Sequence, residues 1–260
     1  MSSRELNALQ RMEYPGRIII IGRDAIGEHD VVVYAITGRS PASQARRLVW
    51  DGHGAVRTEV TDARQLKSGD KRLLLYNCLR VSPKGLAVAN GAQTNLIWQT
   101  AMKLSVKAEP PQAAEILRRA FARPALVSGI DVTSYEPDRP VFTPRISGCV
   151  AQDAALAIVR RNPDGSAQRE FFQIPLEPAR GALLTTYRGE NRTPPPSFSG
   201  QPLEVGLSGI TAAEISQAIY QALGPQDQKK DLCVGVAVVF RSRQSYKLSV
   251  SIINRTPGEG

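Results

Sequence analysis

Runs of apolar residues alternate with short polar segments along most of the chain. The Ile-rich run 17–22 and the Val-rich run 31–38 predict two buried strands, and the turn-rich residues between them predict a hairpin. The basic segment 38–47 that follows predicts a surface loop. A second strand pair is predicted at 72–81 and 85–91, with its turn at the letters SPKG.

Three helices are predicted further along the chain. Residues 94–104 form an apolar run for which Thr94 is a suitable N-cap. Residues 110–121 begin with proline and place several apolar side chains on one face. Residues 211–223 open with Thr and carry Glu three positions later, which is the pattern of a capping box.

The order of the remaining segments predicts the fold class. Further strands are predicted at 144–161, 167–174, 182–189, 232–240 and 246–253. A Pro-, Ser- and Gly-rich loop is predicted at 190–202, long enough to be a lid. Strand hairpins that are segregated from helices favour an α+β fold with antiparallel sheets. We expect one domain at 14–253, after a polar and partly helical extension at 1–13 and before a frayed tail at 254–260.

Composition narrows the class of protein. The chain has 260 residues, of which 42% are hydrophobic and 22% charged, as in an ordinary globular protein. It has no apolar run of membrane-spanning length, and its start does not resemble a secretory signal. Three cysteines without metal-ligand spacing and only two histidines argue against a structural zinc site. We therefore expect reduced thiols and a cytoplasmic location.

The net charge of +9 suggests an anionic partner. A phosphorylated metabolite and a nucleic acid both fit such a charge, and a merely solvated basic surface fits it equally well. Nucleic acid is the less favoured partner, because aromatic residues make up only 6% of the chain and do not alternate with basic ones.

The stretch YNCLR, at the end of a predicted core strand, is unusually polar. Strict alternation places Tyr76, Cys78 and Arg80 on one face of the strand and Asn77 and Leu79 on the other. Each residue has an ordinary structural explanation, but buried polar groups need partners. Cys78 is best interpreted as a packed thiol, because nothing in the sequence places a histidine beside it.

Three other segments interrupt the apolar pattern with polar residues. Each has a structural explanation: the first is a basic loop, the second a turn with a helix cap, and the third an ion-paired surface loop. Each also has a functional interpretation. The functional readings are a phosphate or amide clamp, an anion site at a helix start, and a carboxylate base that faces an arginine. The residues concerned are Arg39, Arg46, Asn90, Gly91, Thr94, Glu136 and Arg145.

These segments together resemble a known family. YPGRIIIIGR, GRS, YNCLRV, VANGAQT and YEPDRPVFTPRISG occur in the order and approximate spacing of the archaeal-type IMP cyclohydrolase family, over about residues 14–190. The resemblance implies an N-terminal-nucleophile-hydrolase-like fold, a four-layer αββα sandwich, in which no N-terminal nucleophile is used. It also implies an activity, the closure of 5-formamidoimidazole-4-carboxamide ribotide to IMP. The partner would then be this small-molecule ribotide, and no metal or organic cofactor would be needed. A homo-oligomer is one option for the assembly.

The resemblance also implies roles for individual residues. Tyr76, Glu136 and one arginine, Arg39 or Arg46, match the catalytic positions. The residues that match the nucleotide-pocket positions are Asn77, Arg80, Asn90, Gly91, Thr94 and Arg145.

The chain departs from the family pattern at three places. Thirteen residues precede Tyr14, Gln93 stands where the family pattern has histidine, and the Pro-rich loop 190–202 is an elaboration. These departures keep open a paralogue that acts on another ribotide. The net charge of +9 keeps open a nucleotide- or nucleic-acid-binding protein without catalysis.

Overall fold

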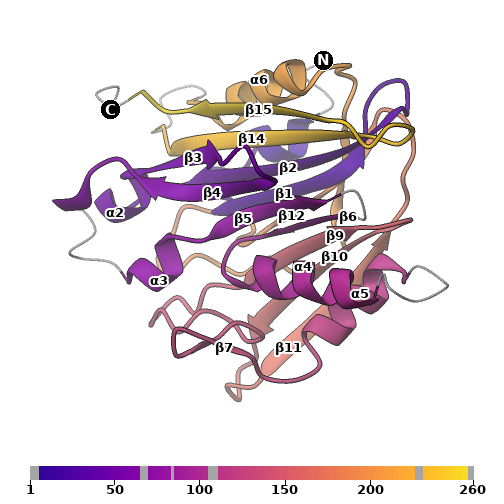
Figure 1. Cartoon of the computed structure of the whole chain (residues 1–260). Coiled ribbons are helices and arrows are strands. Elements are labelled where there is room, and N and C mark those ends of the chain that lie inside the picture. Colours follow the sequence, from indigo (N-terminus) through magenta and orange to yellow (C-terminus); the bar gives the residue numbers. More distant parts are fainter. Residues whose placement is uncertain (1–5, 65–69, 83–84, 105–110, 226–230, 257–260) are drawn as a thin grey trace.

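The computed structural model describes residues 6–64, 70–82, 85–104, 111–225 and 231–256, and these residues form two large antiparallel sheets (Figure 1). The first sheet has six strands in the order β13 (Leu203–Gly206), β12 (Arg180–Thr185), β1 (Arg17–Arg23), β2 (His29–Thr37), β14 (Cys233–Ser242) and β15 (Leu248–Asn254). The second has seven strands in the order β11 (Ala167–Ile174), β10 (Ala154–Arg161), β9 (Arg145–Val150), β6 (Gly85–Ala89), β5 (Asn77–Ser82), β4 (Ala55–Val60) and β3 (Arg46–Trp50). A small hairpin of β7 (Leu126–Val127) and β8 (Ile130–Asp131) lies outside both.

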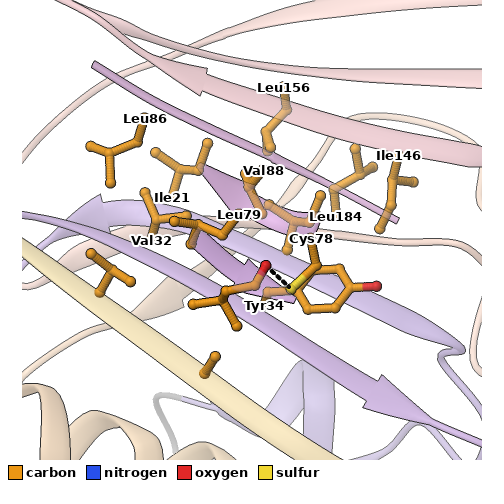
Figure 2. Close-up of a cluster of buried hydrophobic side chains, with 14 of the residues drawn as sticks. Ile21, Val32, Tyr34, Cys78, Leu79, Leu86, Val88, Ile146, Leu156 and Leu184 are labelled. Atoms are coloured by element: carbon orange, nitrogen blue, oxygen red, sulfur yellow. Dashed lines mark hydrogen bonds between the residues drawn. The ribbon is translucent and has the colours of Figure 1, made fainter. Parts of the chain in front are cut away.

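The core lies in three apolar clusters. The largest lies between the two sheets and includes Tyr34 and Cys78, as Figure 2 shows. A second lies on the other face of the six-stranded sheet, under α6 (Ala212–Leu223) and the short α1 (Asn7–Gln10). A third lies on the other face of the seven-stranded sheet, under α4 (Gln93–Leu104) and α5 (Ala113–Ala120). Central strands such as β2 are buried on both faces, which explains their uninterrupted apolar sequence.

The structure confirms the predicted antiparallel α+β class and several elements. The strands β1 and β2 pair as a hairpin, as do β10 and β11 around the predicted NPDG turn. Helix α6 begins where predicted, since the Thr211 hydroxyl accepts a hydrogen bond from the Glu214 amide at 3.1 Å. The Glu214 carboxylate accepts from the Ile210 amide instead of closing a full capping box on Thr211. The loop 190–202 contains no helix or strand.

Four predictions of local structure were wrong. The basic segment 38–47 is not all loop: it contains the helical turn α2 (Pro41–Gln44) and the first residues of β3. The strands β3 and β4 were not predicted, because charged residues interrupt their apolar pattern. The run 72–81 is not one strand either, because Asp70 caps a helical turn, α3 (Lys71–Leu74), and β5 starts only at Asn77.

The other two wrong predictions concern the start of a helix and the start of the tail. Thr94 is not a cap but lies inside the first turn of α4, where its hydroxyl donates to the Gly91 carbonyl at 2.9 Å. The tail does not begin at Asn254, which ends β15 with its side chain bonded to Leu48. Four predicted features lie partly outside the described residues. They are the extension (at 1–5), the tail (at 257–260), the SPKG turn (at 83–84) and the second helix (at 110).

Candidate active site

Two tyrosines from opposite sheets meet at one end of the space between the sheets. Tyr34 comes from β2 and Tyr76 lies directly before β5, and their hydroxyl oxygens are 2.7 Å apart. Thr58 fixes the backbone of Tyr76, since its hydroxyl accepts from the Tyr76 amide at 2.9 Å. Tyr34 is fully buried and Tyr76 nearly so. The hydroxyl pair is therefore held rigidly from both sheets.

Two buried arginines lie beside these hydroxyls. Arg17 is the first residue of β1 and Arg46 the first of β3, and both are more than nine-tenths buried. The Nε of Arg46 donates to the Ser43 carbonyl at 3.0 Å. Among the described residues, both Nη atoms of Arg46 and the Nε of Arg17 have no hydrogen-bond partner. Buried donors of this kind are uncommon, because each costs about 1–3 kcal/mol when left unpaired.

A carboxylate completes the cluster from the loop after β8. Glu136 is 2% exposed, and its Oε1 lies 3.6 Å from the Nη1 of Arg145, the first residue of β9. The Asn90 amide lies 3.5 Å from the same oxygen and donates to the Pro144 carbonyl at 2.9 Å. Gln93 connects this group, accepting from Arg145 at 3.1 Å and donating to Asn90 at 3.0 Å.

The pKa values of these groups reflect their burial and their mutual charge. Burial raises the pKa of Glu136, although Arg17 and Arg145 oppose the shift. Burial lowers the pKa of Arg46, and the neighbouring charge of Arg17 lowers it further. Burial alone would lower the pKa of Arg17, but the ionisable Tyr76 and Glu136 raise it well above its usual value. Glu136 thus has the perturbed pKa that is common among catalytic carboxyl groups.

A second chain of aromatic and polar contacts runs from this cluster toward the surface. The Tyr187 hydroxyl lies 2.8 Å from the Thr143 hydroxyl, which in turn donates to Asp138. Tyr187 stacks on Tyr14, with ring centroids 5.3 Å apart. The guanidinium of the half-buried Arg39 lies over the Tyr14 ring, 4.4 Å from its centroid. Arg39 also donates to the Arg192 carbonyl in the Pro-rich loop at 2.9 Å.

The structure brings together only some of the residues expected in the site. Tyr76, Glu136, Arg46, Asn90 and Arg145 belong to one buried cluster. Gly91 lies directly against it, because a side chain there would come within 2.5 Å of an Arg145 nitrogen. Thr94 is buried and bonds only backbone carbonyls.

Asn77 and Arg80 lie elsewhere, and the predicted alternation was wrong. The side chains of both donate to Asn95 of α4, at 3.1 and 3.3 Å, and the guanidinium of Arg80 lies over the Trp98 ring. They therefore face the helices, whereas Tyr76, Cys78 and Leu79 all face the space between the sheets. A register irregularity between β4 and β5, at Val56 and Arg57, accompanies this break in alternation.

Cys78 has the environment of a packed thiol. It is fully buried, and its sulfur lies 3.3 Å from the Val56 carbonyl (Figure 2, dashed line). Burial raises the pKa of this thiol far above its ordinary value. A thiolate nucleophile is therefore disfavoured at this position.

Sequence reasoning missed three members of the cluster. Arg17 precedes the run IIII and looked like the charged end of a strand, and Tyr34 interrupts VVV and AI as a core aromatic residue. Tyr187 ends LLTTY and lies two residues after the end of β12, at a position that carried no other signal. The only usable sequence signal was a polar side chain on an otherwise apolar strand.

Two cavities lie away from this cluster. One, of about 320 Å³, lies between residues of β11 and β12 and includes Phe172, Arg180 and Glu204. The other, of about 440 Å³, includes Arg11, Arg188 and Arg192. Neither is lined by a residue of the buried cluster.

The described residues contain no group of three or more His, Cys, Asp and Glu side chains placed to hold a metal ion. Among the same residues, no helix is long and apolar enough to cross a membrane. The cluster itself offers an ionisable carboxyl, a hydroxyl donor and cationic N–H donors. These are the groups needed to take up a proton, deliver one and stabilise a negatively charged oxygen.

The chain is distantly similar to several solved structures. The chain is similar to Anbu from Hyphomicrobium sp. strain MC1, at 12% identity over 93% of this chain and 89% of that one, with a TM-score of 0.33. A Gly-1 mutant of the same protein is similar at 10% identity over 94% and 90%, also with a TM-score of 0.33. No curated protein sequence matches the chain.

Comparison with models of protein families shows the family to which this chain belongs. The sequence model of the family described as IMP cyclohydrolase-like protein matches residues 14–244, which include every member of the buried cluster. The match therefore covers most of the 260 residues. The chain belongs to the IMP cyclohydrolase-like protein family.

Proposed function

We propose that this protein is an IMP cyclohydrolase, which closes 5-formamidoimidazole-4-carboxamide ribotide to IMP with loss of water. The observation that carries the proposal is the convergence of Tyr76, Glu136 and Arg46 in one buried cluster, in a member of the IMP cyclohydrolase-like family. The proposal includes a four-layer αββα sandwich of the N-terminal-nucleophile-hydrolase type and a single domain at 14–253. A cytoplasmic location in purine synthesis and the absence of a cofactor also belong to it.

The reaction forms one bond between the carboxamide nitrogen and the formyl carbon. The formyl oxygen leaves as water, with one proton from the carboxamide nitrogen and one from the formamido nitrogen. The carboxamide is a poor nucleophile, so the two reacting groups must be held in contact. Burial supports this requirement, since Glu136 and Arg145 are each only 2% exposed.

Glu136 is the proposed base for the carboxamide proton. Its raised pKa strengthens it as a base, and its links to Arg145 and Asn90 hold the carboxylate in place. Tyr76 is the proposed acid for the departing oxygen, with Tyr34 orienting its hydroxyl. Arg46, and not Arg39, is the proposed catalytic arginine, because Arg39 is held at the Pro-rich loop.

The other residues expected to bind the substrate have different proposed roles, which depend on where their side chains lie. Asn90, Gly91 and Arg145 are proposed to bind the substrate beside Glu136. Thr94 supports the turn that carries them. Asn77 and Arg80 have no part in the proposed chemistry, because both face α4.

The direct test is purified protein with the formamido ribotide, with IMP formation followed by absorbance. We expect turnover by the wild type and a loss of about 100-fold or more in kcat for Tyr76→Phe and for Glu136→Gln. Matched controls are Tyr246→Phe and Glu177→Gln, at exposed positions away from the cluster. Wild-type rates of IMP formation in both Tyr76→Phe and Glu136→Gln would refute the proposed mechanism.

The replacement of the family's histidine by Gln93 favours one alternative, a paralogue that acts on another ribotide. Gln93 cannot carry charge and is already bonded to Arg145 and Asn90. A folded wild type that binds IMP but never forms it from the formamido ribotide would support this paralogue over the cyclohydrolase.

A further inference from the structure

Arg17 and Arg46 point into the same space from different sheets. Arg17 lies on the same face of β1 as Ile19 and Ile21, which belong to the core between the sheets. Arg46 lies on the same face of β3 as Leu48, which belongs to that core as well. Arg17 pairs with Ile36 of β2, two residues from Tyr34, and Arg46 acts electrostatically on Arg17, so both lie where Tyr34 and Tyr76 meet.

Arg17 is anchored through its backbone and Arg46 through the Nε of its side chain, which leaves guanidinium donors of both free. The Arg17 amide donates to the Thr186 hydroxyl at 3.1 Å, and its carbonyl accepts from the Thr186 amide at 3.0 Å. The single bond from the Nε of Arg46 to Ser43 orients that side chain. Within the described residues, the Nε of Arg17 and both Nη atoms of Arg46 are buried without a partner.

Protein stability does not explain this arrangement. Two like charges buried together repel each other, and buried charged donors without partners cost several kcal/mol. Nearby, three arginines (Arg17, Arg46 and Arg145) act electrostatically on Glu136, while Asp131 and Asp138 act on Arg145. An anionic oxygen of a ligand would satisfy the free N–H donors of Arg17 and Arg46.

We propose that Arg17 and Arg46 form a two-guanidinium site that receives an anionic oxygen of the substrate, and that Arg17 is thus a further residue of the active site. The identity of that oxygen rests on the proposed function. It is either the formyl oxygen, which becomes negatively charged as the ring closes, or an oxygen of the ribotide 5′-phosphate. The neighbouring Tyr76 and Glu136 favour the formyl oxygen.

The first arm of the test does not depend on cyclisation. Inorganic phosphate is added to the full-length protein at constant ionic strength, with chloride as control, and Tm is measured. We expect phosphate to raise the Tm of the wild type and of Arg64→Gln, an arginine that is 86% exposed. We expect little or no rise for Arg17→Gln and Arg46→Gln. No rise in the wild type, or an equal rise in Arg17→Gln, overturns the proposal.

The second arm identifies the oxygen by steady-state kinetics. If Arg17 binds the formyl oxygen, Arg17→Gln lowers kcat by about tenfold or more and leaves KM within about twofold. If Arg17 binds the phosphate, KM rises and kcat stays within about twofold. Unchanged kcat and KM overturn the proposal.

Two controls separate the possible failures. Circular dichroism shows whether Arg17→Gln folds, and if it does not, Arg17→Lys decides, since it keeps the charge but loses the planar fork. We then expect a smaller phosphate effect than in the wild type, and an equal effect counts against the site. A wild type without cyclohydrolase activity refutes the proposed function, while the phosphate arm still decides whether the anion site exists.

Discussion

At the residue scale, the hydroxyl pair of Tyr34 and Tyr76 forms a hydrogen bond between the two sheets. Each hydroxyl serves as the partner of the other at 2.7 Å, within an apolar core. Burial, followed by the neighbouring Tyr76, raises the pKa of Tyr34 well above its usual value. Tyr34 therefore stays protonated at neutral pH and is able to orient the hydroxyl of Tyr76.

We predict that Tyr34→Phe lowers kcat by about tenfold and leaves KM nearly unchanged, because Tyr76 loses the partner that positions it. Tyr220→Phe, on the far side in α6, is the matched control. The measurement is steady-state kinetics with the formamido ribotide. An unaltered kcat would show that Tyr76 is positioned by other groups.

The pH dependence of activity follows from the direction of the Glu136 shift. Glu136 must be ionised to accept a proton, so kcat/KM rises with pH through its pKa. Because burial raises that pKa, we predict the midpoint of this rise above the ordinary value of 4.5. A pH–rate profile tests this, and a midpoint at or below 4.5 contradicts it.

At the element scale, one side chain connects the edges of the two sheets. Asn254, the last residue of β15, accepts from the Leu48 amide at 2.8 Å and donates to the Leu48 carbonyl at 2.9 Å. It thus provides β3 with the two hydrogen bonds that a neighbouring strand would make. This contact holds β3, the strand that begins with Arg46, against the six-stranded sheet.

We predict that Asn254→Ala destabilises the protein by about 1–3 kcal/mol, because it leaves both backbone groups of Leu48 unpaired. Lys247→Ala, at an exposed position near the start of β15, is the control. Urea denaturation measures the difference. A stability equal to that of the control would show that water replaces the Asn254 contacts without cost.

At the scale of the whole molecule, the two sheets pack closely where β9 lies against β1. A side chain at Gly148 would bring its Cβ to 2.5 Å from the Cδ1 of Ile21 and to 3.0 Å from a Val88 methyl. Glycine is therefore required at this position by packing between the sheets. The spacing of the two sheets in turn sets how the cluster at their end is assembled.

We predict that Gly148→Ala destabilises the protein by about 1–3 kcal/mol through overpacking. Ile21→Val removes the Cδ1 atom that is closest to the new methyl group. The double variant should therefore lose less stability than the sum of the two single variants. Denaturation of all four proteins completes the cycle, and strictly additive losses would contradict the proposed contact.

The sequence by itself determined the elements whose signal is local. The strands β1, β2, β10 and β14 are long apolar runs, and α6 has a Thr cap followed by an apolar face. The resemblance to the family also grouped Tyr76 and Glu136 with one arginine, Arg39 or Arg46, because the order of several motifs is informative even where single residues are not. The antiparallel α+β class followed from the segregation of strands and helices.

Only the tertiary structure decided which polar residues share a space. Arg17 and Tyr34 are brought to Tyr76 by strand pairing and by the packing of one sheet on the other, over sequence separations that no local pattern records. Arg80 was assigned to the wrong face because an irregular register breaks the simple alternation of β5. Local sequence sets the period of a strand, but its neighbours set the register, and the register decides which side chains meet.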